Sequence, residues 1–330
     1  MNIRPFQPPQ DLDTMIALVT EGFDYPENPE WSVRPDEKEG LIDSMQAAKS
    51  MWPLIRFIQF FSPIFKDVMC GFIAEQDGKP IGLINFMRQR DEPEWYIGNI
   101  TVLPSHRRRG IARQLVKAAL DDLRARKARI AILDVVDGNL PALRLYKEMG
   151  FEIFSGSVEM DLEADSVVPA PILPEGWTIV SQSRFDWQSR FELAKRITPK
   201  NVARYEPAVE ARFRAPIIRT LIGALFTKLS GDDTKRFILC PPDGRIAGIA
   251  RTMFRTRQGG ANAADIDLDP SHPEIAQFIL VHAITTIQAV SPGRRIGFEF
   301  KNWQPALIQA AASLGCKKRC GGHRMGLKFE

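Results

Sequence analysis

The sequence predicts two tandem copies of one α/β fold, in which helices flank the strands of a central sheet. Two observations carry this prediction. Five short segments of the first half recur in the second half in the same order, at an offset of about 163 to 166 residues. Within the first copy, strand-like and helix-like segments alternate around a glycine turn, which is typical of a crossover between strands.

The repeat is clearest in two pairs of segments. "NITVLPSH" (99–106) corresponds to "DIDLDPSH" (265–272), and "DGKPIG" (77–82) corresponds to "DGRIAG" (243–248). "PLIR", "NLPAL" and "EMGF" return as "PIIR", "WQPAL" and "SLGC". The proline-rich segment "DLEADSVVPAPILPEGW" (161–177) has the composition of a linker. We therefore expect domains at 1–163 and 177–330, joined by a linker at 164–176.

The first copy can be divided into elements by its hydrophobic pattern. Apolar residues three to four apart predict a helix over 11–22, and a second helical region over 36–65 that Pro53 and Pro63 break. An Asp-Gly turn between two apolar runs predicts a hairpin over 70–89. The remaining elements are a strand at 95–104, a helix at 110–127, a buried strand at 128–136, a helix at 140–149 and a last strand or pair at 150–162.

Bulk composition excludes several classes of protein. The 330 residues are 44% hydrophobic and 25% charged, with a formal net charge of +4, which suits an anionic small molecule but is too weak for nucleic-acid binding. Four scattered cysteines fit a reducing compartment. The start lacks a signal-peptide pattern, and no apolar run approaches the roughly 20 residues of a membrane span. We expect a soluble, cytoplasmic protein without a membrane span.

The densest positive charge of the chain stands directly before a glycine turn. In "PSHRRRGIA" (104–112) the turn follows a predicted strand and precedes a predicted helix. Backbone N–H groups at a helix N-terminus have no partner within the helix, and the helix dipole adds positive charge there. Gly110 and Ala112 allow a ligand close to the backbone, and Arg107 to Arg109 add charge. The segment therefore predicts a pyrophosphate site.

These residues resemble the GNAT superfamily of N-acetyltransferases. "RRRGIA" matches the acetyl-CoA signature of that family through Arg107, Gly110 and Ala112. "NLPALRLYKEMGF" (139–151) matches its second signature, about 30 residues further along the chain. The match is close over about 67–159 and weaker over the first 65 residues. The resemblance implies a mixed, mostly antiparallel sheet that opens beside the strand ending at Pro104, with acetyl-CoA in the opening.

The resemblance also assigns roles to residues. It implies that the backbone of Ile100, Thr101 and Val102 lies along the coenzyme, with Ile100 and Val102 bonding the pantetheine amides and the Ile100 N–H polarising the acetyl carbonyl. It places the 3′-phosphate at Arg113. It places the pyrophosphate on the backbone amides of the basic loop, those of Arg108, Arg109, Gly110, Ile111 and Ala112. Asn139 would bond the pantetheine arm or the next strand. Tyr146 would protonate the departing thiolate, since a phenol is protonated at neutral pH.

Structural roles are also open for some of these residues. Tyr146 is spaced from Leu143 as a core tyrosine on an amphipathic helix would be, and Asn139 is equally suited to cap its helix. The general base stays unassigned. Many relatives have a glutamate where this chain has Tyr96, and neither Glu92, Glu94 nor Asn99 replaces it convincingly.

The second copy keeps the fold pattern but loses the chemistry. Its loop reads "PSHPEIA" (270–276), two residues shorter and without the arginines and the glycine. Pro273 lacks an N–H and Glu274 is negative, so both oppose a pyrophosphate. Alanines 310–312 stand where the first copy has Tyr146. We expect a degenerate GNAT-like domain that binds no acetyl-CoA and serves as a structural partner or as one wall of the acceptor site.

Two further features bear on the acceptor site and on metal binding. The apolar stretch "MWPLIRFIQFFSPIF" (51–65) can be core, an interface, the lining of an acceptor site or a membrane-surface segment. Cys316, Cys320 and His323 have metal-like spacing, but they lack a fourth ligand and the intervening "KKR" repels a cation, so no metal is expected.

The sequence thus predicts an acyl-CoA-dependent N-acetyltransferase acting through its first domain. An unidentified primary amine would attack the thioester of acetyl-CoA directly, without a metal or a covalent enzyme intermediate. The alternatives are a non-catalytic acyl-CoA-binding sensor or assembly module, and a transferase of a larger acyl group. A monomer with two pseudo-symmetric domains and a homodimer both fit the sequence.

Overall fold

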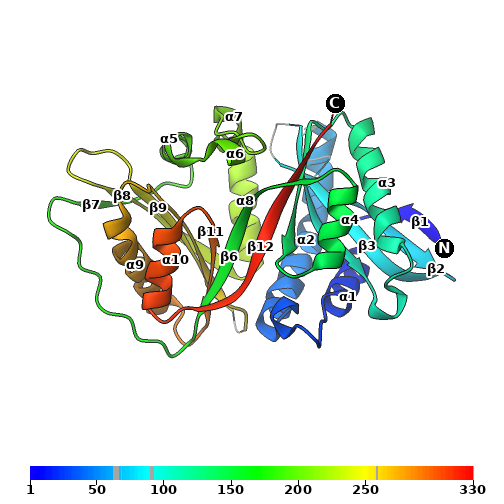
Figure 1. The fold of residues 1–330 in the computed structure, drawn as a ribbon, viewed down its shortest axis with the longest axis horizontal. Coiled ribbons are helices and arrows are strands. Elements are labelled where there is room, and N and C mark those ends of the chain that lie inside the picture. Colours follow the sequence, from blue (N-terminus) through cyan, green and yellow to red (C-terminus); the bar gives the residue numbers. More distant parts are fainter. Residues whose placement is uncertain (62–66, 68, 90–92, 258, 330) are drawn as a thin grey trace. The chain divides into compact units, whose positions relative to one another are not determined.

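The computed structural model describes residues 1–61, 67, 69–89, 93–257 and 259–329. Two compact units make up the chain (Figure 1). The N-terminal unit comprises Met1–Phe154 and the C-terminal segment His323–Glu330, and the C-terminal unit comprises Ser155–Gly322. The end of the chain therefore returns to the unit in which the chain begins.

The N-terminal unit has a mixed sheet with helices packed against it. Its strands follow the order β1-β2-β3-β4-β5-β12, where β4 and β5 are parallel and the pairs from β1 to β4 are antiparallel. The elements are β1 (Asn2–Pro5), α1 (Leu12–Gly22), η1 (Pro29–Trp31), α2 (Pro35–Phe61), β2 (Cys70–Gln76), β3 (Lys79–Arg88), β4 (Glu94–Val102), η3 (Pro104–His106), α3 (Ile111–Ala125), β5 (Ile130–Val136), α4 (Leu140–Glu148), the start of β6 (Glu152–Leu162) and the end of β12 (Lys317–Lys328).

The C-terminal unit repeats this pattern of strands. Its order runs β6-β11-β10-β9-β8-β7, and the only parallel pair among those with a described register is β10 with β11. Its further elements are β7 (Thr178–Ser181), α5 (Gln188–Ile197), α6 (Lys200–Ala203), α7 (Glu210–Phe213), α8 (Ile217–Leu229), β8 (Asp232–Cys240), β9 (Gly248–Arg255), β10 (Asn262–Leu268), η4 (Pro273–Ile275), α9 (Ala276–Val290), β11 (Ile296–Lys301) and α10 (Pro305–Ser313). Residues 163–177 form no helix or strand. The predicted fold class is confirmed in both units.

Most elements of the first copy form where the sequence predicts them. The hairpin β2–β3 turns at Asp77 and Gly78, both with positive φ, as a two-residue Asp-Gly loop requires. The helix predicted over 110–127 is α3, which is slightly shorter at both ends. β1 was not predicted, because four residues are too few for a periodic pattern.

The prediction that Pro53 breaks the second helix is wrong. α2 continues through Pro53 to Phe61. A proline inside a helix removes one backbone hydrogen bond, but Met51, Trp52 and Ile55 around it are all buried. Packing of this face holds the helix together across the proline. Pro63 lies outside the described residues.

Between residues 51 and 59 the apolar stretch has one buried face and one exposed face. Met51, Trp52 and Ile55 are buried, whereas the exposed fractions of Leu54 and Phe57 are 41% and 64%. The core interpretation is therefore confirmed for the buried face. The predictions for residues 62–66 concern positions outside the described residues.

Helices cover both faces of the sheet in the N-terminal unit. α3 packs on β2, β3 and β4, and α1 packs on β3, β4 and α2. Successive side chains of a strand point to opposite faces. Thr101 of β4 bonds the Leu18 carbonyl of α1, whereas its neighbour Val102 packs against the core that contains Leu115 of α3. The strand that leads to the basic loop is thus fixed from both sides.

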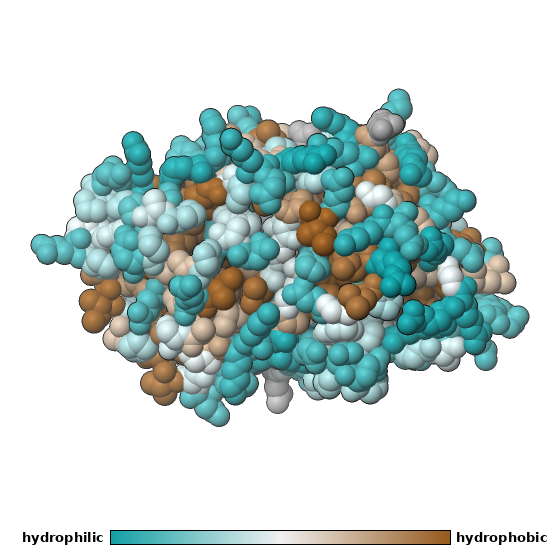
Figure 2. All heavy atoms as spheres, viewed as in Figure 1, coloured by the Kyte–Doolittle hydropathy of each residue, from teal (hydrophilic) through white to brown (hydrophobic). Residues whose placement is uncertain are grey.

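The core of the C-terminal unit centres on α9. Ile279, Leu280, Ala283, Ile284 and Ile287 of this helix are fully buried. Residues Pro273–Val290 are long and apolar enough to cross a membrane by length and composition, and half of this window is buried in the protein. Core helices pass the same test, and the burial matches that explanation. Hydrophilic residues dominate the face drawn in Figure 2, with separate hydrophobic patches between them.

Candidate functional site

The candidate site is a cleft in the N-terminal unit, created where β4 and β5 separate. The two strands pair in parallel from Glu94 with Ile130 to Ile97 with Leu133, and the pairing ends there. Both strands continue, β4 to Val102 and β5 to Val136. A cleft of about 760 Å³ lies along this opening.

The cleft collects most of the residues that the sequence predicts. It is lined by eleven of the twelve residues that the sequence assigns to the site, together with others from the loop after α1 and from β5. These eleven are Ile100, Thr101, Val102, Arg107, Arg108, Gly110, Ile111, Ala112, Arg113, Asn139 and Tyr146. Thr101 directs its hydroxyl to α1. Arg109 does not line the cleft and donates to the Ser105 carbonyl at 3.0 Å.

The basic loop has the backbone shape of an anion site. Gly110 is the N-cap of α3 with φ +76°, and Arg108 has φ +62°. Left-handed residues in a turn direct consecutive N–H groups into one concavity, and the helix dipole favours negative charge there. A Cβ added at Gly110 would meet no atom within 4 Å, so the glycine serves the backbone conformation rather than a tight fit against protein.

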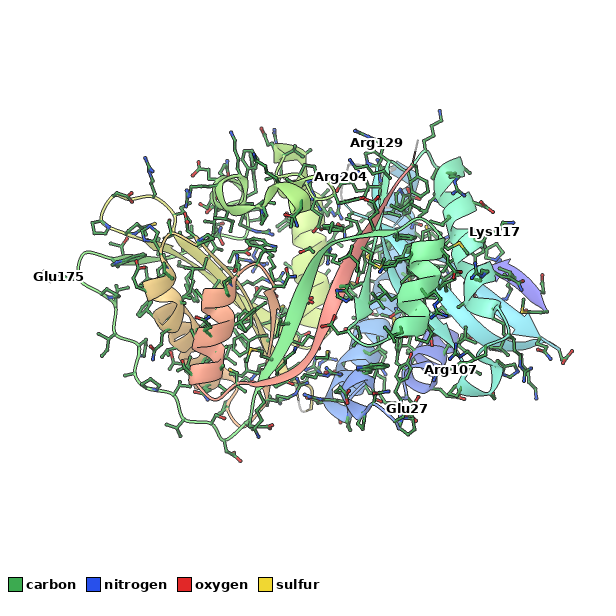
Figure 3. All side chains as sticks on the ribbon, viewed as in Figure 1. Glu27, Arg107, Lys117, Arg129, Glu175 and Arg204 are labelled. Atoms are coloured by element: carbon green, nitrogen blue, oxygen red, sulfur yellow. The ribbon has the colours of Figure 1, made fainter. Side chains whose placement is uncertain are left out.

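Arg107 has a structural position that the sequence does not reveal. Its Nη2 donates to the Gly22 carbonyl at 2.9 Å and its Nε to the Val102 carbonyl at 3.3 Å. Its guanidinium lies over the Tyr25 ring, 4.6 Å from the centroid. The side chain thereby ties the end of α1 to the end of β4. Figure 3 shows Arg107 and Glu27 at the same end of the N-terminal unit.

Arg113 and Asn139 also contact protein groups. Arg113 forms an ion pair with Glu148, which links α3 to α4. The Asn139 side chain accepts a hydrogen bond from the Ala142 N–H at 3.2 Å and caps α4. The capping role expected for Asn139 is therefore confirmed. Its role toward a coenzyme stays a prediction.

Tyr146 lies at the wall of the cleft and is 6% exposed. Its ring meets Phe151 edge-on, with 6.3 Å between centroids. Burial raises the pKa of Tyr146 well above its ordinary value, and the nearby phenol of Tyr25 adds to this. The hydroxyl is therefore protonated throughout the neutral range. Tyr146 serves in the core, as its helical spacing allows, and also reaches the cleft.

Sequence reasoning missed a charged group on β5. Asp134 lines the cleft at the point where the strands separate. Its Oδ2 accepts hydrogen bonds from the Tyr96 hydroxyl and from Arg324 Nη1, both at 3.0 Å. Asp137, three residues after Asp134, pairs through Oδ1 with Nε2 of His323 of β12 at 3.3 Å. The signal was a single aspartate within the apolar run "AILDVV", but β12 could not be foreseen beside it.

Of the other base candidates, the two described residues, Asn99 and Glu94, do not line the cleft. Asn99 donates its N–H to Asn85 Oδ1 at 2.7 Å, where β4 carries an extra residue relative to β3. Glu94 is buried at the start of β4 and does not line the cleft. Glu92 lies outside the described residues. Among the described residues no group of three His, Cys, Asp or Glu side chains has the arrangement of a metal site.

The C-terminal unit differs at the matching positions. Pairing of β10 with β11 ends at Ala264 with Phe298, so the strands also separate. There Lys301 forms an ion pair with Asp267. The turn before α9 carries Pro273 in η4, and α9 begins without a glycine cap.

A protein-family model matches the part of the chain that forms most of the cleft. Residues 35–151 match the model described as the acetyltransferase (GNAT) family. The chain contains an acetyltransferase domain of the GNAT family. This GNAT domain includes the opening between β4 and β5, the basic loop and Tyr146. The family uses acetyl-CoA.

Several relatives share part of the sequence. Mycothiol acetyltransferase of Thermomonospora curvata is 28% identical over 159 residues, 48% of this chain and 46% of that protein. N-acetyltransferase 8 of Homo sapiens is 32% identical over 87 residues, 25% of this chain and 38% of that protein. The chain thus aligns with less than half the length of these curated relatives.

Solved structures share the tandem fold. A tandem GNAT protein from the clavulanic acid biosynthesis pathway superposes with a TM-score of 0.65 at 14% identity, over 99% of this chain and 98% of the other. A GCN5-related N-acetyltransferase from Sphaerobacter thermophilus gives 0.62 at 14% identity, over 99% and 95%. At this identity the likeness establishes a tandem GNAT fold and nothing about substrates.

Proposed function

We propose that the GNAT domain transfers an acetyl group from acetyl-CoA to a primary amine by direct attack on the thioester. One observation carries the proposal. The opening of β4 from β5 leads directly to a basic loop at the N-terminus of α3, and Tyr146 lies in the same cleft. The cleft therefore combines a place for an extended chain, a place for phosphates and a proton donor.

The residues present fit an acyl coenzyme. Two left-handed residues form a concavity of amides at Arg108 to Ala112, which suits a pyrophosphate. The side chain of Arg108 is exposed beside it and free to add charge. The edge of β4 beyond Ile97 has no pairing with β5, so Ile100 and Val102 offer backbone groups to pantetheine amides. To reach a 3′-phosphate, the Arg113 guanidinium would either break its ion pair with Glu148 or contact both groups at once.

Tyr146 would donate the proton that the departing thiolate needs. Its raised pKa keeps it protonated, so the donor is present at any neutral pH. Attack by the amine forms the C–N bond, and the C–S bond breaks as the electron pair moves to sulfur. The Ile100 N–H would stabilise the negative charge that develops on the carbonyl oxygen.

Asp134 would receive the amine. The carboxylate lines the cleft where the strands separate, and its negative charge would attract the ammonium group of the acceptor out of bulk water. Arg324 and Tyr96 fix its orientation through Oδ2. The ammonium would lose one proton to water before it attacks, and the proton released as the C–N bond forms would pass to this carboxylate or to water beside it.

The C-terminal unit would bind no acetyl-CoA. Pro273 removes one donor from the turn before α9, and Glu274 places a negative charge there. Lys301 of β11 pairs with Asp267 of β10 beyond the last described register pair of these two strands. The division at 163 and 177, a cytoplasmic location and the oligomeric state stay predictions.

The test is release of coenzyme A thiol from acetyl-CoA with a panel of primary amines. We expect turnover with at least one amine, and a large loss of kcat with little change of coenzyme affinity in Tyr146→Phe. The control is Tyr205→Phe, a buried tyrosine of the C-terminal unit. Tight coenzyme binding without thiol release for any amine would favour the sensor instead. Succinyl-CoA in the same assay tests the larger acyl group.

A further inference from the structure

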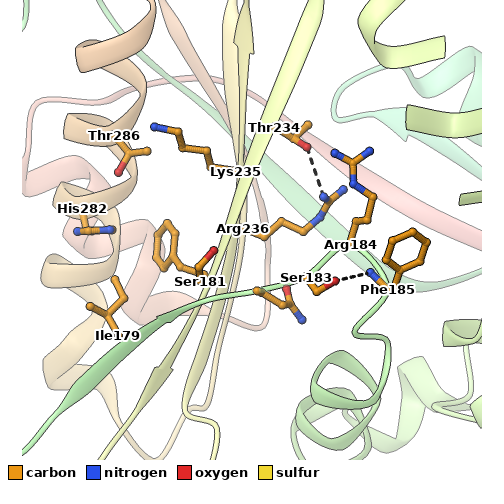
Figure 4. Close-up of a pocket in the computed structure, with 12 residues that line it drawn as sticks. Ile179, Ser181, Ser183, Arg184, Phe185, Thr234, Lys235, Arg236, His282 and Thr286 are labelled. Atoms are coloured by element: carbon orange, nitrogen blue, oxygen red, sulfur yellow. Dashed lines mark hydrogen bonds between the residues drawn. The ribbon is translucent and has the colours of Figure 1, made fainter. Parts of the chain in front are cut away.

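The C-terminal unit contains a second cleft, which the proposed function does not use. It has a volume of about 1090 Å³ and lies between α5, α7, α8 and the strands β8 and β9. We call it the arginine cleft, because six of its lining side chains are basic. They are Arg184, Arg190, Arg214, Lys228, Arg236 and Arg251. A smaller cavity of about 700 Å³, drawn in Figure 4, shares Arg184 and Arg236 with the arginine cleft.

The centre of the arginine cleft holds like charges in direct opposition. Arg236 of β8 and Arg251 of β9 are register partners, so their side chains leave the sheet on the same face. Like charges at such a position destabilise a sheet. In the N-terminal unit the residue that corresponds to Arg251 is Asn85, whose partner is Gly71. The repeat therefore folds without this pair, and folding does not explain it.

Two further guanidinium groups face the same pair. Arg190 of α5 lies close enough to Arg251 and Arg236 for mutual repulsion, and Arg184 lies beside Arg236 (Figure 4). Burial and this repulsion lower the pKa of both Arg190 and Arg236, though both stay charged. The arginines thus converge on one space.

The carboxylates around the arginine cleft have partners other than Arg184, Arg190 and Arg236. Asp265 pairs with Arg251, and Asp267 pairs with Lys301. Asp232 accepts from Arg255 at 3.0 Å, Asp233 accepts from the Thr234 N–H at 2.7 Å, and Asp186 accepts from the Ser189 N–H at 3.1 Å. Within the described part of the chain, Arg190 forms no hydrogen bond or ion pair, and Arg236 donates only to Thr234 Oγ1, at 3.3 Å.

We propose that the arginine cleft binds a small phosphorylated molecule through its phosphate or pyrophosphate group. Among the residues that the structure describes, Arg184, Arg190 and Arg236 form no ion pair with a carboxylate, and three such guanidinium groups call for a ligand with at least two negative charges. Guanidinium forks fit phosphate oxygens with two parallel hydrogen bonds. A single carboxylate would leave most of this charge uncompensated.

The walls of the arginine cleft add a second feature. Phe185, Trp187 and Phe213 line it, and Arg190 lies 6.0 Å from the Phe213 ring centroid. A ring carried by the ligand can stack on such side chains. The loss of the phosphate loop in this unit is thus accompanied by a new anion site elsewhere in the same unit.

Calorimetric titration of the full chain with inorganic pyrophosphate at low salt tests the proposal. We expect two sites per chain, one at the basic loop and one in the arginine cleft. Arg190→Gln and Arg236→Gln should each weaken only the second site by about tenfold to a hundredfold, since a charged hydrogen bond contributes that much. The control is Arg245→Gln, which removes a charge from an exposed turn outside the cleft.

Thermal unfolding gives an independent readout. At the same pyrophosphate concentration, the Tm of the C-terminal unit should rise by more in the wild type than in Arg236→Gln. Without ligand, Arg236→Gln should be at least as stable as the wild type because it removes a repulsive pair. A titration with ADP distinguishes a nucleotide from a free phosphate anion as the source of the phosphate group. If ADP binds more tightly than pyrophosphate, the ligand is a nucleotide; if both bind equally, it is the free anion. An isotherm that neither Arg190→Gln nor Arg236→Gln changes would overturn the proposal, whereas a single wild-type site that both variants weaken would support it and count against the basic loop.

Discussion

Replacing Arg107 should destabilise the N-terminal unit, although the sequence places this residue among phosphate ligands. Arg107→Gln removes the hydrogen bonds to the carbonyls of Gly22 and Val102 and the contact with the Tyr25 ring. Each hydrogen bond of a charged donor contributes about 1.5 to 3 kcal/mol at most, and the ring contact about 0.5 to 1 kcal/mol. The bond to Val102 is long at 3.3 Å and glutamine retains part of one bond, so one bond and the ring contact near the lower end of these ranges are lost, about 2 to 3 kcal/mol in all.

The loss is measurable as a shift of the first unfolding transition. For a unit of this size about 1 kcal/mol corresponds to about 2 to 4 °C, so the Tm should fall by about 4 to 12 °C. Differential scanning calorimetry resolves the two units if they unfold separately, and urea titration gives the free energy. The control is Arg109→Gln, which loses only an exposed bond to the Ser105 carbonyl and should change stability by less than about 0.5 kcal/mol.

Measuring coenzyme A affinity beside the Tm distinguishes a residue that stabilises the fold from one that contacts the ligand. Arg108→Gln should weaken coenzyme A without changing the Tm, because its side chain is exposed at the cleft. If Arg107→Gln unfolded at the wild-type temperature and bound coenzyme A more weakly, Arg107 would be a phosphate ligand and the structural explanation would be refuted.

Three other predictions concern the same unit. Tyr146→Phe should lower kcat by about a hundredfold or more with unchanged coenzyme affinity, as thiol-release kinetics would show; an unchanged kcat would assign Tyr146 to the core alone. The pKa of Tyr146 is raised in the folded protein, so above about pH 10 the unfolded chain loses this proton while the folded chain keeps it, and the folded state becomes less stable. Below about pH 10 the raised pKa has no effect on stability. In urea titrations above about pH 10, the wild type should therefore lose more stability than Tyr146→Phe. Gly22→Ala should cost about 3 kcal/mol or more, because its Cβ would lie 1.8 Å from Thr101 Oγ1, whereas Gly223→Ala in α8 meets nothing within 4 Å and should stabilise slightly; equal unfolding free energies would contradict the packing.

The sequence by itself determined the fold class, most elements of the first copy and the position of the basic loop. These features depend on local patterns. Alternation and helical periodicity place β2 to β5 and α3, and Gly110 marks the turn because few other residues adopt its left-handed backbone. The repeat carried the same elements into the second copy.

Only the tertiary structure decided what each charged side chain contacts. Arg107 and Arg108 are neighbours in one motif, yet one bonds two backbone carbonyls and the other lies exposed at the cleft. Asp134 gains Arg324 from a strand 190 residues away, and Arg236 faces Arg251 through strand register. Local periodicity fixes which face of an element a residue occupies, but its partners on that face come from distant segments, and their charges set its pKa and its availability to a ligand.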